Sequence, residues 1–157
     1  MQLKLGGYKA DKDPAAIEML MTHSSMDPMG GGEPLPNEVL SNLRNSLATI
    51  PNGSIILIYD EQSSVALATA LQGFSTFKCQ LLLNIHDVIV LPEYRRCGLA
   101  KRLIAELESL AVHRGCCKLT PQYCRVIMLL RRCASAAALR PMNLTHSRAT
   151  LCFGKKT

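Results

Sequence analysis

The segment from residue 84 to residue 101 contains the side chains and spacings in this chain that are best suited to chemistry. An apolar run at residues 85–91 leads into a short basic turn, and an amphipathic pattern starts at Leu99. A strand that ends in a tight turn before a helix presents free backbone N–H groups at the helix N-terminus. Together with the helix dipole, these groups bind a phosphate or pyrophosphate. The sequence therefore predicts a phosphate-binding turn at this point.

The turn also carries a family signature. Residues 95–100 read Arg-Arg-Cys-Gly-Leu-Ala, which resembles the Arg/Gln-x-x-Gly-x-Gly/Ala signature of the GNAT superfamily of N-acetyltransferases. The strand at 87–92, the helix at 106–111 and the pair Gly115-Cys116 match the pattern that flanks it. The resemblance covers roughly residues 2–119. It implies an acyltransferase that moves an acetyl group from acetyl-coenzyme A to a primary amine of a small molecule or peptide.

The resemblance also indicates which residues would hold acetyl-coenzyme A. Backbone N–H groups of residues 95–101 would surround the pyrophosphate, and Gly98 would let the backbone approach it closely. The edge of the preceding strand would pair with the pantetheine arm, with one N–H facing the thioester oxygen. The predicted cofactor residues are Val88, Ile89, Val90, Arg95, Arg96, Cys97, Gly98, Leu99, Ala100 and Lys101.

Two neighbouring residues are candidates for accepting the proton of the amine. His86 and Asp87 lie on the strand just before the cofactor residues, and either could act directly or through water. Because neighbouring strand residues face opposite ways, we expect only one of them to face the site. The tyrosine general acid that is usual in the superfamily has no matching position, since Tyr123 stands in a different context.

The acceptor amine is expected between the first two helices, as the resemblance implies. The segment 26–34 reads as a loop there, and its acids Asp27 and Glu33 could meet a cationic amine. Phe74 could line the same cleft. The alternatives for these residues are a solvated acidic loop and ordinary core packing.

Length and composition favour a single globular domain. The chain has 157 residues, 48% of them hydrophobic and 19% charged, and no apolar run is long enough to cross a membrane. The seven cysteines are an odd number without metal-ligand spacing, so we expect reduced thiols, no metal and a cytoplasmic location.

The periodicity of the chain predicts the order β-αα-βββ-α-β. The resemblance implies that this order forms an α/β (α+β) GNAT fold, with a mixed central sheet flanked by helices. The expected strands span residues 2–8, 54–59, 65–73, 81–91 and 118–120. One expected helix begins at Pro14, with Asp13 as its N-cap. Two further helices are expected at residues 36–48 and 99–114.

Residues 120–157 form an atypical C-terminal segment of the domain 1–157. They hold seven Lys or Arg and no acid, whereas the first 119 residues hold all twelve acids. One hypothesis is a shifted reading frame. In the frame one nucleotide earlier, the codons of Met142 and Asn143 must encode Glu, and their neighbours permit Tyr-Glu-Leu-Asp-Pro. A divergent basic C-terminus is the other hypothesis.

We expect a helix at residues 124–139 and otherwise irregular structure in this segment. A sheet that stops at its fifth strand leaves an open edge, which favours self-association, so a homodimer is a further expectation. Two other functions remain open. One is a coenzyme A-binding module without turnover. The other is a nucleic-acid binder that uses the basic tail, against which stands the lack of a basic-aromatic pattern.

Overall fold

The computed structural model describes residues 1–6, 14–121, 140–141 and 151–152. Up to the fifth strand, the elements follow one another in the predicted order. Their bounds are β1 Gln2–Gly6, α1 Pro14–Met26, α2 Asn37–Ala48, β2 Gly53–Asp60, β3 Ser63–Ser75, β4 Gln80–Val90, α3 Leu99–His113, β5 Lys118–Pro121, β6 Arg140–Pro141 and β7 Leu151–Cys152. Short 3₁₀ turns lie at Pro28–Gly30 and Pro92–Tyr94. None of these helices is long and apolar enough to cross a membrane.

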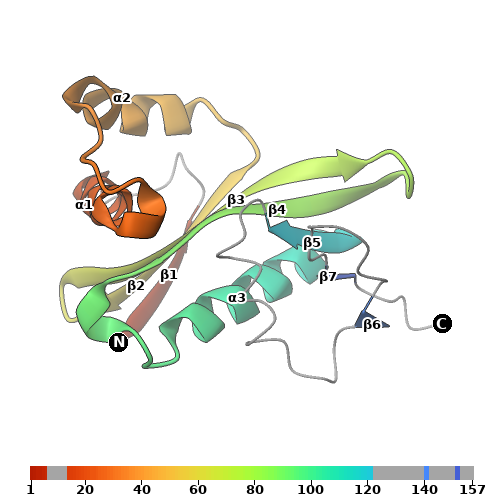
Figure 1. Cartoon of the computed structure of the whole chain (residues 1–157). Helices are drawn as coiled ribbons and strands as arrows, with labels where there is room; N and C mark the ends of the chain where they lie inside the picture. Colours follow the sequence, from red (N-terminus) through yellow and green to blue (C-terminus); the bar gives the residue numbers. More distant parts are fainter. Residues whose placement is uncertain (7–13, 122–139, 142–150, 153–157) are drawn as a thin grey trace.

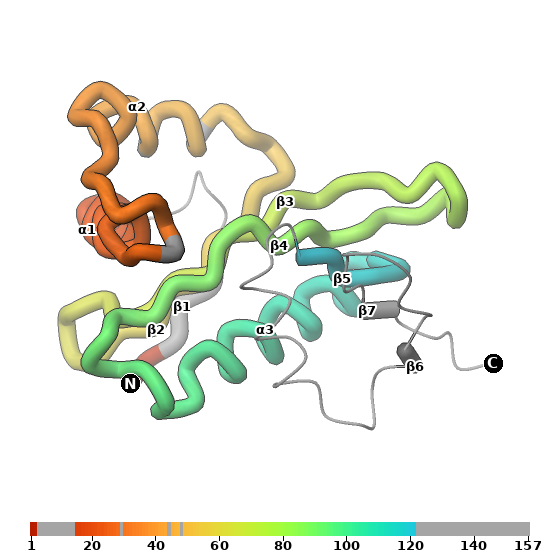
Figure 2. The backbone as a smooth tube through the Cα atoms, viewed as in Figure 1, coloured from red at the N-terminus to blue at the C-terminus, as the bar shows by residue number. Residues whose placement is uncertain are grey.

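The strands form one mixed sheet in the order β1-β2-β3-β4-β5-β7-β6. All described neighbours are antiparallel except β4 and β5, which are parallel and are connected through α3. Helices α1 and α2 cover one face of the sheet and α3 covers the other (Figure 1). The hairpin of β3 and β4 extends beyond this layered body, as the backbone tube makes clear (Figure 2).

The alternation of side chains along β2 divides the core into two apolar clusters. Ile56 and Ile58 pack under α3, whereas Ile55 and Leu57 pack under α1 and α2. From α3 the first cluster receives Leu99, Leu103, Ile104, Leu107, Leu110 and Ala111, which recur at helical spacing. Burying each of the larger side chains stabilises the fold by about 1.5–3 kcal/mol. The two clusters therefore fix α1 and α3 on opposite faces of the sheet.

The segment between α1 and α2, predicted as a loop, folds back against α1. Gly30 donates its N–H to the Asp27 carbonyl at 2.6 Å. A Cβ atom added to Gly30 would lie only 1.8 Å from the Ser24 carbonyl oxygen, so only glycine allows this close approach. The turn thereby holds Asp27 at the C-terminal end of α1.

The sheet continues beyond β5, and this continuation was not predicted from the sequence. Leu119 on β5 pairs with Leu151 on β7, and β7 pairs with β6. The expectation of helical or irregular structure in residues 120–157 is therefore wrong at the two-residue strands β6 and β7. It relied on local sequence pattern, whereas a two-residue strand is defined by the neighbour to which it bonds. The helix expected at 124–139 lies outside the described residues.

Candidate functional site

The candidate site lies along β4, where a β-bulge interrupts the pairing with β3. Thr69 pairs with Asp87, but the next residue, Ala70, pairs with Ile85. His86 is therefore an extra residue on β4 without a partner of its own on β3. A bulge of this kind bends the strand and breaks the alternation of its side chains.

The bulge changes which residues share a face of the sheet. Ile85 and Val88 are three residues apart, yet both pack in the apolar cluster under α3. Strict alternation would place them on opposite faces. The expectation that His86 and Asp87 must face opposite ways is therefore wrong in its premise, because alternation does not hold through these two residues.

The bulge also marks the point at which β4 loses one of its two neighbours. The pairing of β4 with β5 covers Leu83, Asn84 and Ile85 and stops there. From Asp87 to Val90, β4 pairs only with β3 within the described part of the chain. This second half of β4 thus has an edge facing away from β3, which we call the open edge (Asp87 to Val90).

Backbone groups on the open edge can be assigned from one hydrogen bond. The Leu91 N–H donates to the Val65 carbonyl on β3 at 3.0 Å. Because backbone groups alternate in direction along a strand, the N–H and C=O groups of Val88 and Val90 face the open edge. A second hydrogen bond is consistent with this assignment, because the Val90 carbonyl accepts from Arg95 Nε, a group outside β3, at 3.3 Å. The open edge therefore offers alternating donors and acceptors, as an extended amide chain requires.

The turn after β4 has the geometry of an anion site. Arg96 has a φ of 67° and Gly98 a φ of 78°, both in the left-handed region. The first intrahelical bond runs from the Arg102 N–H to the Gly98 carbonyl at 3.0 Å. The N–H groups of residues 99–101 precede it and point out of the helix end. No acid lies in the first turn of α3, and a Cβ atom on Gly98 would meet nothing within 4 Å. The turn thus opens onto space with donors and positive charge.

Two contacts hold this turn from opposite sides. The Tyr94 hydroxyl donates to Asp60 at 3.1 Å, and this hydrogen bond raises the pKa of Tyr94. On the other side, Arg95 Nη2 forms an ion pair with Asp27 Oδ2 at 2.8 Å. Arg95 therefore connects the predicted cofactor turn with the predicted acceptor segment, a link that the sequence did not reveal.

A small pocket lies where these segments meet. Its walls come from the end of α1, the end of β4 and the turn, namely His23, Ser24, Asp27, Ile89, Val90, Pro92 and Arg95. His23 and Ser24 were not predicted from the sequence. In the sequence, only their polarity and their position close to Asp27 could have indicated a site, and polar pairs are common at helix ends.

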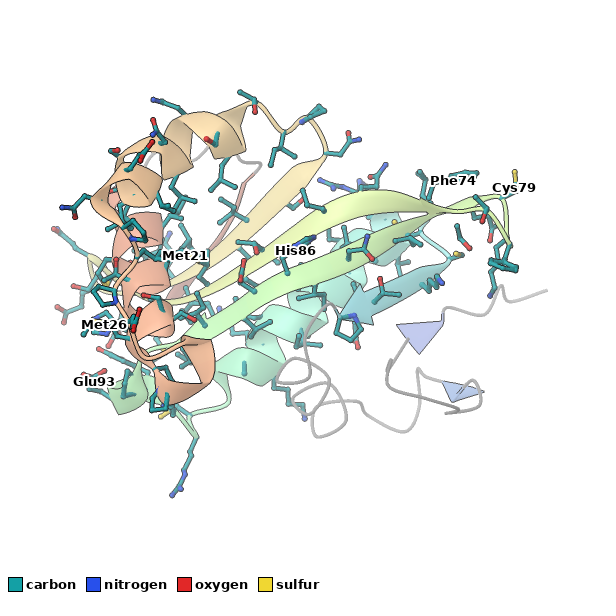
Figure 3. All side chains as sticks on the ribbon, turned by 45° about the horizontal axis from the view of Figure 1, so that its top comes forward. Met21, Met26, Phe74, Cys79, His86 and Glu93 are labelled. Carbon is teal, nitrogen blue, oxygen red and sulfur yellow. The ribbon has the colours of Figure 1, made fainter. Side chains whose placement is uncertain are left out.

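The predicted catalytic residues lie side by side at the bulge. The Asp87 carboxylate accepts a hydrogen bond from the Thr69 hydroxyl at 2.5 Å, and the Asp87 N–H donates to the Thr69 hydroxyl oxygen at 3.1 Å. His86 and Asp87 are both half-buried. Figure 3 places His86 near the middle of the sheet, between Met26 at one end and Phe74 at the other.

The predicted acceptor residues are not brought together. Glu33 is exposed. Phe74 is 56% exposed near the tip of the β3–β4 hairpin, beside Cys79 and away from the helical end of the molecule (Figure 3). Of the three, only Asp27 lines the pocket. Among the described residues, no group of three or more His, Cys, Asp or Glu is placed to hold a metal ion.

Solved structures share this fold across almost the whole chain. An aminoglycoside acetyltransferase from an uncultured soil metagenomic sample, solved with sisomicin, is 15% identical with a TM-score of 0.68, covering 93% of this chain and 95% of that one. The ribosomal-protein-alanine N-acetyltransferase of Brucella melitensis biovar Abortus 2308 is 16% identical with a TM-score of 0.70, covering 92% and 99%. An acetyltransferase of Trypanosoma brucei is 21% identical with a TM-score of 0.60, covering 92% and 99%.

A search of curated proteins finds no match to this sequence. The family comparison is decisive, because the model of the acetyltransferase (GNAT) family matches residues 17–126. That range includes most of α1, the bulge, the open edge and the turn at residues 95–101. The chain belongs to the GNAT acetyltransferase family and is an acyltransferase.

Proposed function

We propose that this protein transfers an acetyl group from acetyl-coenzyme A to a primary amine of a small molecule or peptide. One observation carries the proposal. The open edge of β4 is followed, after Leu91 and the 3₁₀ turn Pro92–Tyr94, by the turn at residues 95–101. Backbone groups for an amide chain and for a diphosphate therefore follow one another along the chain. Pantetheine and pyrophosphate are joined in the same order in coenzyme A.

The residues present fit that cofactor. The turn supplies N–H donors, the side chains of Arg96 and Lys101, and open space in front of Gly98. When bound, acetyl-coenzyme A supplies the activated acetyl group as a thioester. Val88 or Val90 directs an N–H toward the thioester oxygen and stabilises the negative charge that develops there. His86 or Asp87 accepts the ammonium proton, directly or through water.

The acceptor approaches from the side of α1 and α2. Asp27 and Glu33 are acids of the segment between these helices, and Phe74 is an aromatic candidate at a greater distance along the sheet. Two solved structures of similar fold are named an aminoglycoside acetyltransferase and a ribosomal-protein-alanine N-acetyltransferase. Both an aminoglycoside and a protein amine are therefore reasonable acceptors to assay.

Calorimetry with coenzyme A tests the cofactor site. Gly98→Asp places a carboxylate in front of the turn, where it repels the pyrophosphate, and we expect binding to fall at least a hundredfold. Gly115→Asp is a matched control, because Gly115 also has a positive φ (66°) and open space around it but lies at the other end of α3. Equal losses in the two variants would contradict the proposed site.

Turnover with acetyl-coenzyme A and a panel of primary amines tests the reaction itself. We expect amide formation with at least one member of the panel. Coenzyme A binding without turnover of any amine would favour the alternative of a binding module.

A further inference from the structure

Thr69 is a polar residue within an apolar stretch of β3. The stretch from Val65 to Leu71 reads Val-Ala-Leu-Ala-Thr-Ala-Leu, and Thr69 is only 4% exposed. Leu67 and Leu71, two residues away on either side, pack in the cluster under α1 and α2. Thr69 therefore lies on that same face. A buried hydroxyl is costly unless it is hydrogen-bonded, so its partner must matter.

That partner is Asp87, and the contact is reciprocal. The Thr69 hydroxyl donates to the Asp87 carboxylate at 2.5 Å, and the Asp87 N–H donates to the hydroxyl oxygen at 3.1 Å. One side chain thus satisfies the backbone at the bulge and also fixes the carboxylate. Charge-assisted hydrogen bonds of this kind are stronger than neutral ones and restrict the rotamer of the carboxylate.

Asp87 is also well placed relative to both substrates. Through Thr69 it lies on the face covered by α1 and α2, where the predicted acceptor segment begins. Along the chain it directly precedes Val88, whose N–H faces the open edge. Within the described part of the chain, the side chain of His86 has no comparable hydrogen bond. A proton acceptor needs a fixed position, which Asp87 has.

We infer that Thr69 is a positioning residue, which holds the Asp87 carboxylate beside the open edge to receive a proton from the acceptor's ammonium group. The inference rests on the proposed function and assigns the proton acceptor to Asp87. Asp87 takes one proton and later returns it to solvent. The neutral nitrogen then bonds to the acetyl carbon and the C–S bond breaks. The sulfur leaves with the electron pair and takes the second proton that the nitrogen releases.

The substitution Thr69→Val removes the hydroxyl and keeps the shape and the β-branched side chain. With acetyl-coenzyme A and the best amine of the panel, we expect kcat to fall about tenfold, in the range of one lost charge-assisted hydrogen bond. The KM for acetyl-coenzyme A should change less than twofold, because the side-chain hydrogen bonds of Thr69 go to Asp87 and not to Val88, Val90 or the turn. Thr69→Ser keeps the hydroxyl and should restore kcat to within threefold of the unaltered protein.

Amide hydrogen exchange followed by NMR tests the same contact without any turnover. The Asp87 N–H should exchange at least tenfold faster in Thr69→Val and at the original rate in Thr69→Ser. Unchanged exchange in Thr69→Val would overturn the contact and the inference with it. The Leu91 N–H, which bonds to the Val65 carbonyl, is the internal reference.

The variant Asp87→Asn distinguishes the role of Asp87 as proton acceptor from the role of Thr69 as positioning residue. If Asp87→Asn lowers kcat while Thr69→Val does not, the role of Thr69 is wrong and that of Asp87 stands. If neither lowers kcat while His86→Ala does, the proton acceptor is His86 and the inference fails. An unaltered protein that binds coenzyme A but acetylates no amine contradicts the proposed function first.

Discussion

The two halves of β4 differ in how many neighbours they have. From Leu83 to Ile85 the strand bonds to β3 on one side and β5 on the other, and Ile85 is completely buried. From Asp87 to Val90 it pairs with no described strand other than β3. The change takes place at one residue, His86, the extra residue of the bulge.

The difference shows how a single strand can serve both stability and binding. Backbone groups that pair with two neighbours stabilise the sheet but are not available to a ligand. Backbone groups that lack a second neighbour are available, at the risk of unwanted strand addition. The bulge lies between these two parts of an eleven-residue strand, since the described pairing with β5 reaches Ile85 and the register against β3 shifts after it. We therefore expect substitutions before the bulge to affect folding, and substitutions after it to affect binding or catalysis.

Ile85→Ala tests the half with two neighbours and should have the largest effect on stability. Removing this buried side chain should lower the free energy of unfolding by about 2–5 kcal/mol. Val90→Ala is the counterpart in the other half. It should cost about 1 kcal/mol, because Val90 is only half-buried and loses two methyl groups. Urea unfolding followed by circular dichroism measures both. Equal losses in the free energy of unfolding would mean that the two halves of β4 contribute equally to the stability of the core.

Val88→Pro tests the half with one neighbour. Proline removes the N–H that faces the open edge and leaves the hydrogen bonds to β3 in place, as proline does on edge strands. We expect kcat to fall about a hundredfold if this N–H faces the thioester oxygen, with a modest change in stability.

Ile89→Pro is the matched control for Val88→Pro. The Ile89 N–H faces β3, so its loss should lower stability by breaking the ladder between the strands. If Val88→Pro keeps full kcat, the donor to the thioester must be the Val90 N–H or another group.

Asp27→Asn should have the smallest effect and tests how the second half of β4 is connected to α1. The side chain of Arg95, which forms an ion pair with Asp27 and also bonds to the Val90 carbonyl, is 45% exposed. Such a partly solvated pair contributes about 0.2–1 kcal/mol. We expect the KM for acetyl-coenzyme A to rise about two- to fivefold, because Arg95 is then less well held near the turn.

Glu33→Gln is the control for Asp27→Asn. It removes another acid of the same segment, one that forms no ion pair with a described residue. A rise in the KM for the amine in Asp27→Asn, with no rise for acetyl-coenzyme A, would instead show that Asp27 meets the acceptor.

Much of the fold was predictable because it depends on local patterns. The spacing of Leu99, Leu103 and Leu107 predicted α3, and Pro14 marked the start of α1. The bulge was not predictable in this way. The polar residues Asn84, His86 and Asp87 within the run from Leu81 to Val90 do not by themselves mark a bulge, because a bulge is defined by the register against a second strand. The same holds for β6 and β7, which are too short to have a pattern of their own.

For the site, the sequence by itself determined the turn at residues 95–101 and the helix N-terminus that follows it. The left-handed conformation at Gly98 and the helix that follows depend on residues only a few positions apart. Tertiary structure alone decided that Arg95 pairs with Asp27, 68 residues earlier, and that Thr69 holds Asp87 across two strands. These contacts depend on which strands pair, in which register and on which face the helices pack. Those features follow from the burial of the whole core and are not written in any short stretch of the chain.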